Sequence, residues 1–259
     1  GGWYLRYKAG DLLSGASLTL FCAVNQSFFM GMFFLLAGYF TPHSFDAKGA
    51  RRFVIDRLIR LGIPTLIFGF LLGPLTIALA ETPEQFSVLA YWWSLIKQGN
   101  INLGPLWFAY ALLLFSAVYV AIRLLLPRLR GHLSVSALRH STIFAVLVVW
   151  GCAAFLLRLW VPTGREIGFL QIGYFSSYIV LFIIGCGASH SDLFSKIEKR
   201  LALPWIAVSV LTIPSLFIYA ALAGAFAGVP FDLHGGWTLP VAFYAFLEPF
   251  VACGIILGL

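Results

Sequence analysis

Basic side chains crowd one short polar stretch between two apolar runs of the chain. Five of them fall within residues 41–60: Lys48, Arg51, Arg52, Arg57 and Arg60. Guanidinium groups donate paired hydrogen bonds that fit phosphate oxygens, so this stretch could hold a multiply charged anion beside a membrane. On a helix, Arg52, Asp56 and Arg60 would share one face, where the carboxylate could orient both arginines. The alternative is that these charges only fix the membrane orientation of the chain and contact lipid headgroups.

One acidic residue, Glu248, lies near the middle of the last apolar run and is followed by Pro249. An ionised side chain at the centre of a membrane helix costs about 3 kcal/mol, so this one must face the protein interior and find a partner. The proline frees a backbone carbonyl and can open the helix there. Glu248 is therefore our catalytic or substrate-binding candidate. The alternative is a protonated structural residue that forms a hydrogen bond between helices.

Two amides, Asn25 and Gln26, lie well inside the first apolar run. They precede Gly31 and Gly38, and small residues of this kind let membrane helices approach one another closely. The amides could then form hydrogen bonds across the helix contact, or they could contact a ligand. Their residue types do not distinguish these two roles.

The composition predicts a membrane protein. With 61% hydrophobic and 10% charged residues, the chain has too few charges to cover a water-facing surface. Its apolar segments of bilayer-spanning length lie at roughly 18–40, 61–80, 105–126, 141–161, 168–188, 202–226 and 238–259. We expect an all-α, polytopic transmembrane helix bundle with about seven spans, forming a single domain over residues 1–259. Because the chain starts without methionine and ends inside an apolar run, we expect a fragment that is incomplete at both ends.

The basic residues are distributed unevenly between alternate loops. Loops 41–60, 123–140 and 189–200 hold 12 of the 17 Lys and Arg residues. By the positive-inside rule these loops face the cytoplasm and the alternate loops lie outside. The net charge of +7 therefore reflects membrane topology, and we expect no nucleic-acid partner.

Motifs for metal, redox or nucleotide chemistry are missing from the sequence. The four cysteines lie in apolar segments without CxxC spacing, so we expect no metal site and no disulfide. No GxSxG, HExxH, Walker or GxGxxG pattern occurs.

Four stretches, in order along the chain, resemble the acyltransferase-3 family of bacterial integral membrane acyltransferases. They are FFLLAGYFTPHSFDAKGARRFVIDRLIRLGIP, LGPLWFAYALLLFSAVY, YFSSYIVLFIIGCGA and FYAFLEPFVACGIILGL. The first resembles the family's span that leads into an Arg-rich cytoplasmic loop. The last resembles its Glu-bearing late helix. The family's catalytic His motif lies in a first helix that nothing here matches.

The resemblance implies transfer of an acyl group, acetyl or succinyl, from cytoplasmic acyl-CoA to a hydroxyl of an envelope glycan or glycolipid. It implies a multi-pass protein of the bacterial inner membrane, with acyl-CoA as co-substrate and no bound cofactor. Arg51, Arg52, Arg57 and Arg60 would meet the CoA phosphates, and Glu248 would be the late-helix acid. Asn25, Gln26 and Tyr39 would line the bundle. The alternative function is a proton-coupled transporter of an anionic or sugar-like solute, using Glu248.

Overall fold

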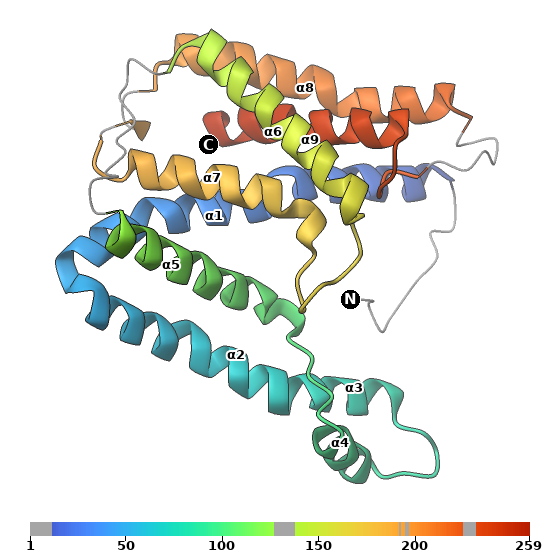
Figure 1. Cartoon of the computed structure of the whole chain (residues 1–259). Helices are drawn as coiled ribbons and strands as arrows, with labels where there is room; N and C mark the ends of the chain where they lie inside the picture. Colours follow the sequence, from blue (N-terminus) through green and yellow to red (C-terminus); the bar gives the residue numbers. More distant parts are fainter. Residues whose placement is uncertain (1–11, 127–137, 192, 195–196, 225–231) are drawn as a thin grey trace. The chain divides into compact units, whose positions relative to one another are not determined.

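The computed structural model describes residues 12–126, 138–191, 193–194, 197–224 and 232–259 (Figure 1). Within these ranges the chain is helical, with no strand beyond one isolated bridge between Ile167 and Leu170. The prediction of an all-α helical membrane bundle is confirmed. The described residues form two compact units: unit 1 lies within Ser44–Arg130 and Glu166–Leu170, and unit 2 within Tyr7–His43, Gly131–Arg165 and Gln171–Leu259.

Apolar helices occur at all seven predicted positions, with two corrections to their bounds. Five stretches are long and apolar enough to cross a membrane: Ser17–Glu81, Gly104–Leu125, His140–Trp160, Lys199–Leu222 and Leu239–Gly258. The first contains two predicted spans and the loop expected between them, because the backbone stays helical through most of residues 41–60. The predicted span at 168–188 is shorter, Ile172–Ala188, since residues 161–171 form turns. Of the basic residues used to predict the topology, five lie outside the described residues: Arg6, Lys8, Arg128, Arg130 and Lys196.

Helix α1 (Leu12–Arg57) crosses the boundary between the units and is broken at Gly49. The φ of Gly49 is 74° and its ψ is 162°, a conformation that side chains with a Cβ rarely adopt. No atom lies within 4 Å of where a Cβ would be, so the backbone conformation alone favours glycine here. The break separates the apolar part of α1 from the basic part that starts at Ala50.

Unit 1 continues from the basic part of α1 through a series of short helical segments. They are η1 (Leu58–Gly62), α2 (Ile63–Ile67), η2 (Phe68–Leu72), α3 (Gly73–Glu81), α4 (Val88–Lys97), η3 (Gly104–Leu106) and α5 (Trp107–Leu125). The π-helical turns η1 and η2 precede Pro64 and Pro74, which cannot donate the usual helical hydrogen bond and so widen the preceding turn. The backbone N–H of Asn102 and the indole N–H of Trp92 donate to carbonyls of η2 at 3.2 and 3.0 Å.

Unit 2 contains α1 up to His43 and five later segments. These are α6 (His140–Trp160), η5 (Ile172–Tyr174), α7 (Phe175–Ala188), α8 (Lys199–Leu222) and α9 (Leu239–Gly258). Helix α9 packs along both α8 and α6 and is the most buried of the long apolar helices. Close approach depends on glycines: Gly254 lies against the backbone of α8, and Gly151 of α6 lies against the Phe246 ring. The hydroxyl of Ser209 on α8 donates to the Val251 carbonyl at 3.0 Å.

Helices α1 and α7 meet at a glycine contact. A Cβ on Gly38 would lie 2.2 Å from the Phe182 carbonyl oxygen, and one on Gly185 would lie 2.1 Å from the Leu35 carbonyl oxygen. The two backbones therefore touch where both helices lack side chains, as small residues permit in membrane bundles. This contact holds α1 against the helix that carries Tyr178, which lies beside the buried charges described below.

Candidate active site

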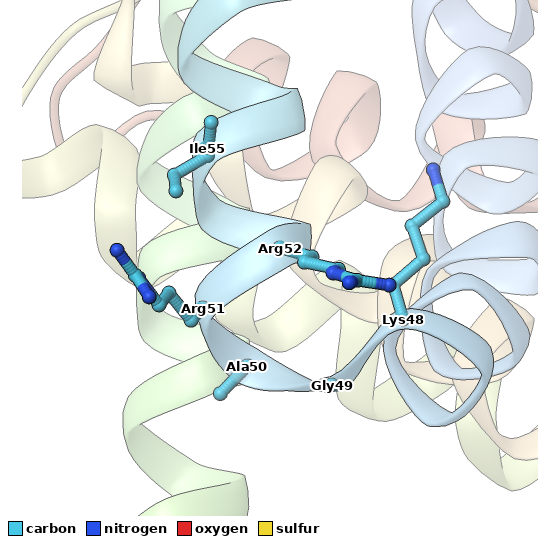
Figure 2. Close-up of a pocket in the computed structure, with 6 residues that line it drawn as sticks. All are labelled: Lys48, Gly49, Ala50, Arg51, Arg52 and Ile55. Carbon is cyan, nitrogen blue, oxygen red and sulfur yellow. The ribbon is translucent and has the colours of Figure 1, made fainter.

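An open, basic hollow forms at the break in α1 (Figure 2). Its volume is about 540 Å³, and its lining residues are Lys48, Gly49, Ala50, Arg51, Arg52 and Ile55. Figure 2 shows Arg51 and Arg52 extending to different sides of the helix that follows Gly49. Both arginines are exposed. The hollow therefore presents two guanidinium groups to solvent, beside the Lys48 side chain.

One acid divides the basic residues into paired and unpaired groups. Asp56 accepts from Lys48 Nζ at 2.5 Å and pairs with Arg60 Nε at 2.9 Å. The expectation that Asp56 orients Arg52 is wrong. Lys48 extends across the break at Gly49 and forms the ion pair with Asp56 instead. Within the described part of the chain, neither Arg51 nor Arg52 has an acidic partner. Arg51 and Arg52 therefore have charge available for a phosphate.

The other predicted arginine, Arg57, packs against an aromatic ring. Its guanidinium carbon lies 5.1 Å from the centroid of the Phe53 ring, and Phe53 is buried. This cation–π contact turns Arg57 toward the protein. Arg57 and Arg60 are thus used by contacts within unit 1, whereas Arg51 and Arg52 point outward.

A polar clamp fixes the segment before the break. Arg123, on α5, donates to Asp46 at 2.6 Å and to the Tyr119 hydroxyl at 2.6 Å. The same guanidinium lies 5.0 Å from the centroid of the Phe45 ring. The clamp holds residues 45 and 46 against α5, and this fixes the helical segment that leads into the hollow at Lys48.

A second polar site lies buried in unit 2. Arg158, near the end of α6, donates from Nη2 to Oε2 of Glu248, in the middle of α9. Arg158 is 0% and Glu248 1% exposed. Each still has one buried atom without a hydrogen-bond partner among the described residues, Nη1 of Arg158 and Oε1 of Glu248. Glu248 therefore has the cationic partner that burying a carboxylate demands, with donor and acceptor capacity left over.

Tyrosines surround the ion pair. The Arg158 guanidinium lies 5.1 Å from the Tyr244 ring centroid and 5.6 Å from that of Tyr174. Its Nε donates to the Gly173 carbonyl at 3.4 Å. Tyr178, on α7, interacts electrostatically with both members of the pair. The cluster joins three helices, α6, α7 and α9, through polar groups in an otherwise apolar core.

Two short segments lie over the end of α6 beside Arg158. The Thr163 backbone N–H and hydroxyl both donate to the His234 carbonyl, at 2.8 and 3.2 Å. A Cβ on Gly235 would lie 2.9 Å from the Arg158 carbonyl oxygen, so the second segment touches the backbone of that residue. The backbone N–H and side chain of His234 lower the pKa of Asp232, which is exposed. We call residues 161–164 and 232–236 the cover of the ion pair.

The three predicted bundle-lining residues have different surroundings. Asn25 donates from Nδ2 to the Phe21 carbonyl of its own helix at 2.8 Å. Gln26 is within side-chain hydrogen-bonding range of Tyr178 on α7, so it connects α1 to the tyrosine cluster. Tyr39 packs against Phe194, with ring centroids 5.4 Å apart. Their role in lining a larger bundle stays a prediction.

The residue that sequence reasoning missed is Arg158. By sequence it counts only as one of the basic residues outside the three cytoplasmic loops, although it lies two residues before the end of α6 inside an apolar run. A cation in such a run is as costly as an acid, and this was a signal that Arg158 and Glu248 should be paired. The tyrosines gave no comparable signal, because aromatic residues are common throughout the apolar segments.

Comparison with known proteins identifies the family. A family model described as an acyltransferase domain matches residues 2–258. Searches among curated proteins and among solved structures give no significant match. The match covers almost the whole chain, and its apolar helices make this a multi-pass membrane protein. The chain belongs to the acyltransferase-3 family of integral membrane acyltransferases.

Proposed function

We propose that the protein moves an acyl group, acetyl or succinyl, from cytoplasmic acyl-CoA to a hydroxyl of an envelope glycan or glycolipid in the bacterial inner membrane. Family membership supports acyl transfer in general and gives no support to a transporter. The basic hollow at Gly49 is the observation that carries the choice of donor. Acyl-CoA is a co-substrate, and the proposal includes no bound cofactor or metal.

The hollow has the charge that a CoA donor requires. CoA carries several negative charges on its phosphates, and arginines bind phosphate oxygens through paired hydrogen bonds. Arg51 and Arg52 are exposed and have no acidic partner within the described residues, so binding need not break an existing ion pair. By the distribution of basic residues, this loop faces the cytoplasm, where acyl-CoA is made.

The transfer step needs no oxidant or reductant. The acceptor hydroxyl oxygen attacks the thioester carbonyl, a C–O bond forms and the C–S bond breaks. The hydroxyl proton passes through a base to the departing CoA thiolate, which leaves as the thiol. The products are an O-acyl ester and free CoA.

Substitution of the outward-facing arginines tests the donor site. Removing one charge-assisted contact costs about 1.5–3 kcal/mol, so Arg51→Ala and Arg52→Ala should each raise the KM for acetyl-CoA about ten-fold or more. We expect a smaller change for Arg60→Ala, because Arg60 is paired with Asp56. The measurement is acetyl transfer by membranes that contain the protein expressed from its complete gene.

Arg200→Ala is the matched control. Arg200 is an exposed arginine in the first turn of α8, at the end of the stretch 189–200 that is assigned to the same membrane side, and it lies outside the hollow. Its loss should leave the KM for acetyl-CoA unchanged. If Arg51→Ala and Arg52→Ala behave like Arg200→Ala, the basic residues serve only to orient the chain in the membrane.

A further inference from the structure

The buried pair of Arg158 and Glu248 is not explained by stability. Burying two charges is costly even when they pair, and apolar side chains of similar size are often as stable or more stable in the same place. The pair also leaves two buried atoms, Nη1 and Oε1, without hydrogen-bond partners within the described residues. Buried polar atoms are normally satisfied, so unpaired atoms of this kind need an explanation.

We infer that Arg158 is a positioning residue that holds the Glu248 side chain in place, so that its second oxygen accepts a hydrogen bond from a hydroxyl of the acyl acceptor. Arg158 Nη1 offers a donor beside it, and the aromatic side chains of Tyr174 and Tyr244, which pack on the guanidinium, border the pair. A hydroxyl-rich, uncharged ring carries both donors and acceptors, which suits this combination. This inference rests on the proposed acyl transfer for the identity of its substrate.

The geometry argues for binding rather than proton transfer by Glu248. A general base must lie within hydrogen-bonding reach of the proton that it removes, whereas the Glu248 carboxyl group is already held by a direct hydrogen bond from Arg158. One carboxylate oxygen is already committed to Arg158 Nη2. Among the described residues, the other titratable groups that face the pair are three tyrosines, Tyr174, Tyr178 and Tyr244. The Tyr244 hydroxyl is within side-chain hydrogen-bonding range of Glu248. The pair therefore works as a fixed charged group, and another residue moves the proton.

The cover marks the route by which an acceptor reaches the pair. Residues 161–164 and 232–236 are joined by the two hydrogen bonds from Thr163 to the His234 carbonyl. Thr163 is also within side-chain hydrogen-bonding range of Tyr174, whose ring packs on Arg158. Separation of these two short segments would uncover the end of α6 that carries Arg158, on the side that the basic-residue pattern assigns to the outside.

Kinetics of Glu248→Gln and Arg158→Lys test the inference. The acceptor is the soluble envelope glycan fraction extracted from cells lacking the gene, and the donor is acetyl-CoA. Each variant should raise the acceptor KM about ten-fold or more while kcat falls less than about ten-fold. The KM for acetyl-CoA and the shape of the pH profile should match those of the wild type. Ser209→Ala is the control, because it removes a buried hydrogen bond of α8 and α9 away from the pair.

Two outcomes would overturn the inference. If Glu248→Gln lowers kcat about a hundred-fold, leaves the acceptor KM unchanged and removes one limb of the pH profile, Glu248 transfers the proton. If the apolar double variant Arg158→Met with Glu248→Leu folds and keeps the wild-type acceptor KM, the pair only connects α6 to α9 and does not bind the acceptor. We expect the double variant to keep the thermal midpoint of the wild type. Its transfer rate should no longer reach a plateau as the acceptor concentration rises.

A binding measurement separates this inference from the proposed function. The same glycan fraction should raise the thermal midpoint of the purified wild-type protein and leave that of Glu248→Gln unchanged. If the wild type shows this shift but transfers no acetyl group, the proposed donor or reaction is wrong and the acceptor site stands. If the glycan fraction shifts neither protein, or shifts both equally, the inference fails.

Discussion

Replacement of Gly185 by alanine should disrupt the contact between α1 and α7. The added Cβ would lie 2.1 Å from the Leu35 carbonyl oxygen and 2.8 Å from the Tyr39 backbone nitrogen. Both neighbours are backbone atoms, which cannot rotate away as a flexible side chain can. The helices would have to part by about 1 Å, a gap at which contacting atoms lose a quarter to a half of their attraction.

The size of the effect follows from two opposing contributions. Forcing an extra methyl group into a close-packed contact typically costs about 1–3 kcal/mol. Alanine in place of glycine within a helix recovers roughly 0.5–1 kcal/mol of conformational entropy. We therefore expect a net loss of about 1–2 kcal/mol, or a fall in Tm of roughly 2–8 °C for a protein of this size.

Gly62→Ala provides the matched control. A Cβ at Gly62 would lie 3.8 Å from its nearest neighbours, which are leucine side chains at ordinary contact distance. Its Tm should stay the same or rise slightly. The assay is thermal unfolding of the purified protein in detergent, followed by circular dichroism at one scan rate. If Gly185→Ala melts with or above the wild type, or if Gly62→Ala falls as far, the close contact of α1 and α7 is wrong.

Two further predictions concern topology and the core. In a background without native cysteines, an impermeant thiol reagent added outside intact cells should label Gln98→Cys and spare Ala47→Cys; the reverse pattern would invert the assigned sides. Ser177→Ala should lower stability by about 1–3 kcal/mol, because the buried Trp150 indole N–H donates to that hydroxyl at 3.0 Å and would lose its partner. An unchanged unfolding midpoint for Ser177→Ala would show that the indole finds another acceptor.

The sequence was sufficient to predict where the helices lie, because their apolar runs match the thickness of a bilayer. It did not predict that the helix continues past residue 40, since the polar composition of residues 41–48 resembles that of a loop. It also did not predict α4, whose residues lie in a stretch expected to be an outer loop. The contact of Asp46 with Arg123 holds residues 44–48 against α5, and α4 starts at the Ser87 cap and packs on α3.

The candidate site was only half predictable for a similar reason. The basic residues are contiguous in sequence, so their clustering could be seen before the structure was known. Which of them are paired could not be predicted, because the bend at Gly49 brings Lys48 to Asp56. Arg158 and Glu248 are 90 residues apart, and only the packing of α6 on α9 brings them together.

Acyl transfer itself is tested by following radiolabelled acetyl-CoA. Inside-out membrane vesicles with the protein expressed from its complete gene should move label into the envelope glycan or glycolipid fraction, as an ester that mild alkali releases. Vesicles without the gene should not, and the double variant of Arg51→Ala and Arg52→Ala should show little transfer at low acetyl-CoA. Absence of alkali-labile label that depends on the gene, at saturating acetyl-CoA, would contradict the proposed function.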